Sequence, residues 1–194
     1  MTAHAPTAEL QRIGVKLCLD GDQAPSPSDL IPIFHRWIRE AAVEGLLIDV
    51  ADYSHVHHGP GVMLIAHEGD YALDMADGRP GLLYQRKQPL AGASLAERVA
   101  EVARLALAAC DRLEEAPELG GRVRFRRDEA LVIANDRLRA PATEASFEAL
   151  KPAVEALADG PLPAARGEAR QTGDLRERLT LVLKAPSLPE PGLD

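Results

Sequence analysis

The sequence predicts an α+β protein, with a largely antiparallel sheet of about eight or nine strands and three helices packed on it. Short segments with alternating apolar and polar residues, separated by turn sequences, predict the strands. Three longer segments repeat apolar residues at helical spacing. We expect residues 1–194 to form a single domain, with a seam between halves near residues 87–93 and frayed ends at residues 1–12 and 186–194.

The first half of the chain predicts a strand, a helix and then four further strands. The first strand covers residues 14–20, and the helix follows in "DLIPIFHRWIREAAVEG". With Asp29 as its N-cap, Pro32 falls in the first turn, where its missing N–H is harmless. The next strands are predicted at residues 46–52, 61–66, 71–75 and 82–87. Four strands in succession favour antiparallel pairing, because parallel neighbours need long crossovers.

The second half predicts two helices and three strands. Ser94-x-x-Glu97 is a capping-box pattern that begins a long helix, and Cys110 lies on its apolar stripe. Residues 122–128 and 130–136 predict a hairpin that turns at Asp128-Glu129. Thr143 caps the next helix, and a last strand follows at residues 179–183.

Composition excludes several classes of protein. The net charge of −8 argues against a nucleic-acid-binding surface, which needs Lys and Arg to bind phosphates. No apolar run approaches the roughly 20 residues of a membrane-spanning helix. The N-terminus lacks the pattern of a secretory signal, so we expect a cytoplasmic protein. The only two cysteines are expected to be buried thiols.

The segment "YSHVHHGPG", residues 53–61, is the first candidate site. His55, His57 and His58 stand within four positions, and imidazole is the commonest metal-binding side chain. Asp49 and Asp52 lie just upstream, where carboxylates could complete a divalent-metal site or orient the histidines. The alternative is a solvated turn that joins two strands, since Gly-Pro-Gly is ordinary turn chemistry.

The residues around His55 and His57 do not complete any of the known His-x-His motifs. A metallo-β-lactamase-like zinc motif needs Asp and His where Gly59 and Pro60 stand, and a cupin needs Gly where Asp49 stands. His55-Val56-His57 matches the element of rolling-circle nucleases, but no tyrosine lies in a predicted helix to serve as their nucleophile.

Three arginines form the second candidate site. Arg122, Arg124 and Arg126 alternate with apolar residues, so their guanidinium groups should line one face of a strand. Such a row can bind a phosphate or carboxylate through paired donors. It is also typical of a solvated strand face that is balanced by nearby Glu and Asp.

The stretches "IPIFHRWI", "LLIDVADYSHVHHGPGVMLIAHEGDYALD", "GLLYQRK" and "ANDRLRAP" together resemble a bacterial protein family of unknown function. The resemblance extends from the first strand to the third helix. It implies a bacterial, soluble, full-length domain, and it carries no activity, ligand or catalytic residue.

Two hypotheses for the function follow. In the first, the protein is a small cytoplasmic binding protein or enzyme that holds a divalent metal or a small anionic ligand at the His-rich segment 49–61. In the second, it is a non-catalytic interaction protein, an accessory subunit or a homo-oligomer, and the same segment is a rigid surface loop.

Overall fold

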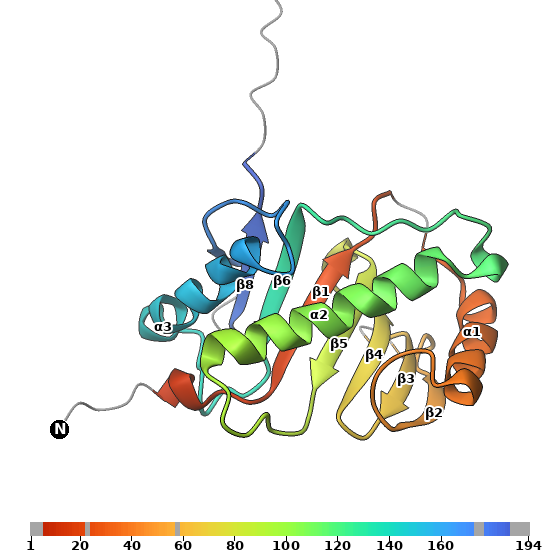
Figure 1. Ribbon diagram of the computed structural model, residues 1–194, viewed down its shortest axis with the longest axis horizontal. Helices are drawn as coiled ribbons and strands as arrows, with labels where there is room; N and C mark the ends of the chain where they lie inside the picture. The colour runs from red at the N-terminus through yellow and green to blue at the C-terminus, as the bar shows by residue number, and fades with distance from the viewer. Residues whose placement is uncertain (1–5, 22–23, 57–58, 173–176, 187–194) are drawn as a thin grey trace, which may run out of the picture.

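The computed structural model describes residues 6–21, 24–56, 59–172 and 177–186. In these residues the chain forms one eight-stranded antiparallel sheet and three α-helices that lie on one side of it (Figure 1). The predicted α+β fold is confirmed. The strands are β1 (Ile13–Cys18), β2 (Leu47–Asp52), β3 (Val62–Ala66), β4 (Gly69–Asp74), β5 (Gly81–Arg86), β6 (Glu129–Ala134), β7 (Arg170–Thr172) and β8 (Thr180–Lys184). The helices are α1 (Pro27–Glu40), α2 (Leu95–Glu114) and α3 (Glu144–Glu155).

The order of strands in the sheet is β2-β3-β4-β5-β1-β6-β8-β7. The first strand of the chain therefore lies in the middle, where it pairs with β5 on one side and β6 on the other. The sheet continues across the predicted seam at residues 87–93, because β1 joins the strands before the seam to the strands after it.

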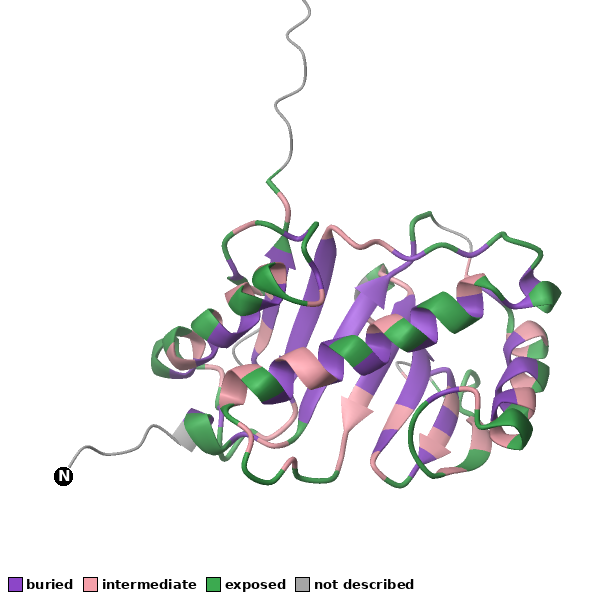
Figure 2. Cartoon of the chain, viewed as in Figure 1, coloured by how far each residue is buried: buried purple, intermediate pink, exposed green. Residues whose placement is uncertain are grey.

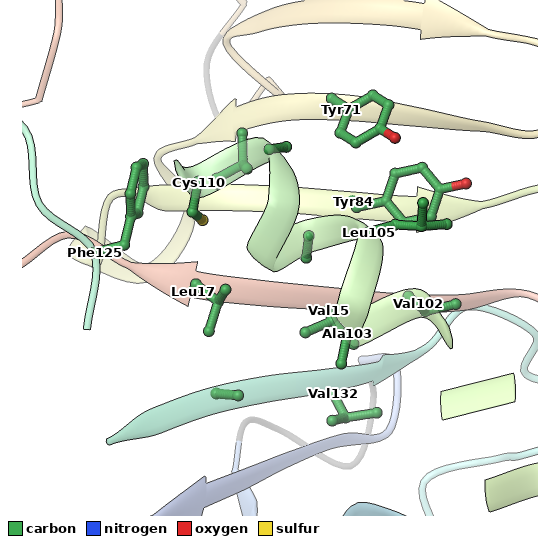
Figure 3. Packing of buried hydrophobic residues seen from close by; sticks show 14 of the residues in the cluster. Val15, Leu17, Tyr71, Tyr84, Val102, Ala103, Leu105, Cys110, Phe125 and Val132 are labelled. Carbon is green, nitrogen blue, oxygen red and sulfur yellow. The ribbon is translucent and has the colours of Figure 1, made fainter. Parts of the chain in front are cut away.

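The hydrophobic core lies between the sheet and the helices. Helix α2 crosses β1 and β5, α1 packs beside β2 and β3, and α3 packs beside β8 (Figure 1). Alternate residues of the strands point into this core, among them Val15, Leu17 and Val132 (Figure 3). The rings of Tyr71 and Tyr84 contact each other there, with their centroids 4.5 Å apart. Both cysteines are buried free thiols, as predicted.

Two of the three predicted helix N-caps are confirmed, and one is wrong. The capping box of Ser94 and Glu97 is confirmed, and Thr143 caps α3. The assignment of Asp29 as the N-cap of the first helix is wrong, because Ser26 occupies that position and α1 begins at Pro27. Asp29 instead accepts a hydrogen bond from the Ser26 backbone at 3.0 Å. Pro32 consequently lies inside the helix and not in its first turn.

Two segments depart from the predicted strands. Residues 122–128 do not form a hairpin strand, since a single isolated bridge joins Phe125 to Leu19. Val123 and Phe125 are buried, so the alternation in this segment reflects burial without a hydrogen-bonded ladder. Strand β7 was not predicted, because its three residues are all polar.

Part of the expected frayed N-terminus is ordered. Pro6–Glu9 forms a 3-10 helix, and Leu10 is fully buried. Residues 1–5 and 187–194 lie outside the described part of the chain.

The opposite face of the sheet is covered by none of the three described helices. Nevertheless β1 and β6 are buried along their whole length (Figure 2). Leu83, Leu131 and Ile133 point to this side and are each less than 9% exposed. Lys16 also points to this side, near the middle of the sheet. We call this side the helix-free face.

None of the described helices combines the length and the apolar composition that crossing a membrane requires.

Candidate functional site

The His-rich segment forms a closed turn after strand β2. The Tyr53 N–H donates to the Gly61 carbonyl at 2.8 Å, which brings the two ends of the segment together. Inside it, the Val56 N–H donates to the Tyr53 carbonyl and the Gly59 N–H donates to the Val56 carbonyl. His57 and His58 lie outside the described residues. The predicted turn between two strands is present, and we call residues 53–61 the His turn.

Two glycines are required for the close approach of this turn to its neighbours. Gly61 has a φ of +71°, and a Cβ there would lie 2.5 Å from the Leu73 carbonyl oxygen. A Cβ on Gly59 would lie 2.8 Å from the Tyr53 carbonyl oxygen. Any side chain at either position would push the turn away from β4 or open it.

Asp52 and His55 are neighbours at the beginning of the turn. Asp52 Oδ1 accepts hydrogen bonds from the Ser54 N–H at 2.9 Å and the Ser54 hydroxyl at 2.5 Å. These bonds lower the pKa of Asp52 below its usual 3.8. Burial opposes them, and the charge of His55 adds a smaller lowering of the same pKa. The Asp52 carboxylate is therefore held at the beginning of the turn by Ser54.

Asp49 does not join this pair. It lies opposite Ile65 in the ladder, whereas Asp52 lies opposite Val62, so the two carboxylates are on different faces of β2. The Asp49 carboxylate accepts the Val50 N–H at 2.8 Å. Within the described ranges no group of three or more His, Cys, Asp and Glu side chains could hold a metal ion. The predicted metal set of His55, His57, His58, Asp49 and Asp52 thus stays a prediction, because two of its histidines are not described.

A cavity of about 540 Å³ lies between the His turn, the beginning of α1 and the end of β4. We call it the loop cavity. Its apolar lining includes Leu30, Val56, Val62, Leu73 and Met75, and its polar lining includes Ser54 and His55. The volume lies within the range of about 300–1,000 Å³ that is usual for small-molecule pockets. A few polar groups in an apolar cavity can orient a ligand.

Exposed apolar side chains gather near this cavity and along β2. The large hydrophobic residues that are exposed include Leu46, Ile48, Tyr53, Val56 and Met75. Val56 and Met75 line the loop cavity, and Ile48 lies on β2, which is an edge strand. Val56 and Met75 therefore place exposed apolar surface at the loop cavity, as is common in ligand-binding grooves.

The three arginines of the second candidate site already contact carboxylates. Arg122 lies 3.9 Å from Asp29, and Arg124 lies 3.8 Å from Glu114. Arg126 pairs with Asp128 at 2.8 Å. These contacts fit the interpretation of a balanced surface, while the predicted role of the row in binding an anion stays a prediction. None of the three lines the loop cavity.

Sequence reasoning missed a buried ion pair on the helix-free face. Lys16 Nζ donates to Asp74 Oδ2 at 2.5 Å and to the Ala76 carbonyl oxygen at 3.3 Å. Lys16 is only 2% exposed, which is rare for lysine. The available signal was one lysine inside the otherwise apolar segment "IGVKLCL".

The ion pair of Lys16 and Asp74 fixes the chain segment that forms a wall between two cavities. Leu73, Met75 and Ala76 line the loop cavity, and Asp74 and Ala76 line a second cavity on the helix-free face. Lys16 holds this segment to the central strand β1.

No model of a known protein family matches this chain, and no curated protein has a significantly similar sequence.

Proposed function

We propose that this protein binds a small, mainly apolar molecule in the loop cavity, with a polar or anionic group of that molecule facing His55 and Ser54. The observation that carries the proposal is a cavity of about 540 Å³ with a mainly apolar lining and two polar side chains at the His turn. The proposal agrees with the first hypothesis from the sequence, in which a ligand binds at the His-rich segment. It adds that most of this ligand is apolar.

Two further observations support a ligand in this place. Gly61 lets the turn lie against β4 and Gly59 lets the turn close on itself, so the shape of the cavity is set by the fold. Exposed Val56 and Met75 stand in its lining, where an apolar ligand would cover them. Burying apolar surface contributes about 25 cal/mol per Å², so such contacts supply the affinity and the polar groups supply the orientation.

The test uses N-phenyl-1-naphthylamine, a neutral apolar dye that fluoresces when it leaves water. We expect saturable fluorescence with the full-length protein and a loss of at least tenfold in affinity with Val56→Asp or Met75→Asp. Leu138→Asp is the matched control, because Leu138 is an exposed leucine that does not line the cavity. Dye binding that is equal in all four proteins would contradict the proposal.

The metal version of the hypothesis has its own measurement. Protein that is purified without a histidine tag is analysed for zinc, manganese and iron, and again as the His55→Ala, His57→Ala double variant. Bound metal in stoichiometric amount that disappears in the variant would support a divalent metal as the ligand at the His turn. A metal-free protein whose thermal stability does not respond to these ions would refute it.

The second candidate function is a non-catalytic interaction protein that docks a partner on β2. The observation that favours it is the contrast between the two edges of the sheet. Strand β2 exposes Ile48 next to exposed Leu46, whereas β7 at the other edge is short and polar. Edge strands of this apolar kind pair with other chains unless they are protected. Light scattering of the wild type and of Ile48→Asp distinguishes a homo-oligomer through β2 from a monomer.

A further inference from the structure

A groove on the helix-free face has the form of a ligand site. A cavity of about 490 Å³ lies over β1, β5 and β6, and its floor consists of Leu83, Leu131 and Ile133. A neighbouring cavity of about 680 Å³ continues along the same strands, where Gln85 and Asn135 line it. Gly14 faces both β5 and β6 in this region, and a Cβ there would lie 3.2 Å from Leu83. We call the two cavities together the sheet groove.

Basic side chains outnumber acidic ones around the sheet groove. Seven basic residues and four carboxylates line it, although the whole chain carries a net charge of −8. Some of these cations are paired: Lys16 with Asp74, and Arg139 with Glu9. The groove is therefore a positive region on an acidic protein.

Four arginines of the groove have no carboxylate within 4.0 Å in the part of the chain that the structure describes. They are Arg12, Arg86, Arg137 and Arg178, whereas Lys16, Lys87 and Arg139 are paired. Arg178 donates to the amide oxygen of Asn135 at 3.0 Å, which places its guanidinium group beside both cavities. By contrast, Arg122, Arg124 and Arg126 each have a carboxylate partner. Guanidinium groups without a carboxylate partner keep their donors for an incoming anion.

From these observations we infer that the sheet groove binds an amphipathic organic anion. Its apolar body lies on Leu83, Leu131 and Ile133, and its phosphate or carboxylate group is bound by Arg137 and Arg178. Both parts of the groove are needed for this assignment. The apolar floor is buried without a helix above it, and the arginines stand at its border. This site is separate from the loop cavity, although Ala76 contributes to the lining of both.

Lys16 acts here as a positioning residue. Its ammonium group already holds Asp74 and the Ala76 carbonyl, so it fixes one wall of the groove. The ligand anion is assigned to the arginines, because the charge of Lys16 is balanced by Asp74 at 2.5 Å.

The test is calorimetric titration of the full-length protein with hexyl phosphate, hexanoate, inorganic phosphate and hexanol. We expect one hexyl phosphate or hexanoate per chain, and at least tenfold weaker binding of hexanol and inorganic phosphate. The comparison of hexyl phosphate with hexanoate shows which anionic group the arginines prefer. Affinity should fall as sodium chloride is raised, since the contact is ionic.

Matched variants connect this binding to the groove. Arg137→Gln with Arg178→Gln should weaken hexyl phosphate at least tenfold, whereas the control Arg112→Gln with Arg166→Gln should not change it. Circular dichroism and the melting temperature verify that every variant folds. The dye that probes the loop cavity should still bind the groove variant, and Val56→Asp should still bind hexyl phosphate. The two proposals can therefore fail separately.

Three results would overturn the inference. One is no binding of either organic anion at millimolar concentration. Another is binding that the groove variant retains unchanged. The third is loss of binding in Arg122→Gln, Arg124→Gln, Arg126→Gln with the groove variant unaffected, which would move the anion to the row that the sequence suggested.

Discussion

Replacing Lys16 with methionine should destabilise the protein more than any surface substitution. The Lys16 side chain is 3% exposed, the Asp74 side chain is 13% exposed, and their charged atoms are 2.5 Å apart. Removing one member of a buried ion pair leaves the other charge without compensation, at a cost of about 3–5 kcal/mol. Because water partly reaches Asp74, we expect the lower end for Lys16→Met, about 3 kcal/mol.

The converse substitution and the double variant complete the cycle. Asp74→Asn leaves the more deeply buried Lys16 without its partner, so its cost should equal or exceed that of Lys16→Met. With both charges removed, the stability should return to within about 1 kcal/mol of the wild type, because a buried ion pair adds little net free energy. The coupling free energy between the two sites, which is the loss in the double variant minus the sum of the two single losses, is then larger in size than the effect of either single change.

Urea unfolding measures these changes through the fluorescence of Trp37, the single tryptophan of the chain, which is buried. A loss of about 3 kcal/mol corresponds to a melting temperature lower by roughly 6–12 °C in a protein of this size. A loss of less than about 1 kcal/mol in Lys16→Met, or a double variant as unstable as the two single variants combined, would show that the two charges are not a coupled buried pair.

Three further predictions concern other parts of the fold. Gly61→Ala should lower the melting temperature more than Gly78→Ala. Both residues have positive φ, but only at Gly61 would a Cβ meet a backbone oxygen, that of Leu73. Equal losses in thermal melts would contradict this clash. Both cysteines are buried and burial raises the pKa of each thiol, so a thiol reagent at pH 8 should label them only after denaturation, as counted by mass spectrometry. The hydrogen bond from Arg126 lowers the pKa of Asp128 below its usual 3.8, so its contribution to stability is present above about pH 4 and is lost as the pH falls through the lowered pKa. Urea midpoints between pH 3 and pH 6 should therefore fall less steeply in Asp128→Asn, and identical slopes would refute this.

Local sequence signals predicted most of the fold. The capping box at Ser94 and the alternation in β1 to β6 depend on neighbouring residues, so they can be recognised without the tertiary structure. The predicted strand at residues 122–128 was wrong because these residues run beside the end of β1 with alternate side chains buried. Alternate burial gives the same sequence pattern as a hydrogen-bonded strand. Three polar residues at a sheet edge, as in β7, give no apolar pattern at all.

The candidate sites were harder to predict from the sequence than the fold, because each site depends on contacts between segments that are distant along the chain. The His turn was located correctly as a turn between two strands. Its cavity also needs Leu30 of α1 and Met75 after β4, which are separated from the turn along the chain. The sheet groove needs Arg137, which follows β6, and Arg178, which precedes β8, in the lining of one cavity, and the pairing of β6 with β8 brings them there.

The position of Lys16 links the stability of the fold to the two proposed binding sites. A hydrophobic residue of similar volume at this point of β1, with Asp74 also replaced, would leave the fold about as stable. Stability alone therefore does not explain a charged pair in the centre of the sheet. The pair does hold Asp74 and the Ala76 carbonyl, and these belong to the wall between the loop cavity and the sheet groove. A wall that is fixed by two directional hydrogen bonds keeps both cavities in shape, which apolar packing of the same volume would do less specifically. We therefore expect the double variant of Lys16 and Asp74 to fold well and yet bind both probes more weakly.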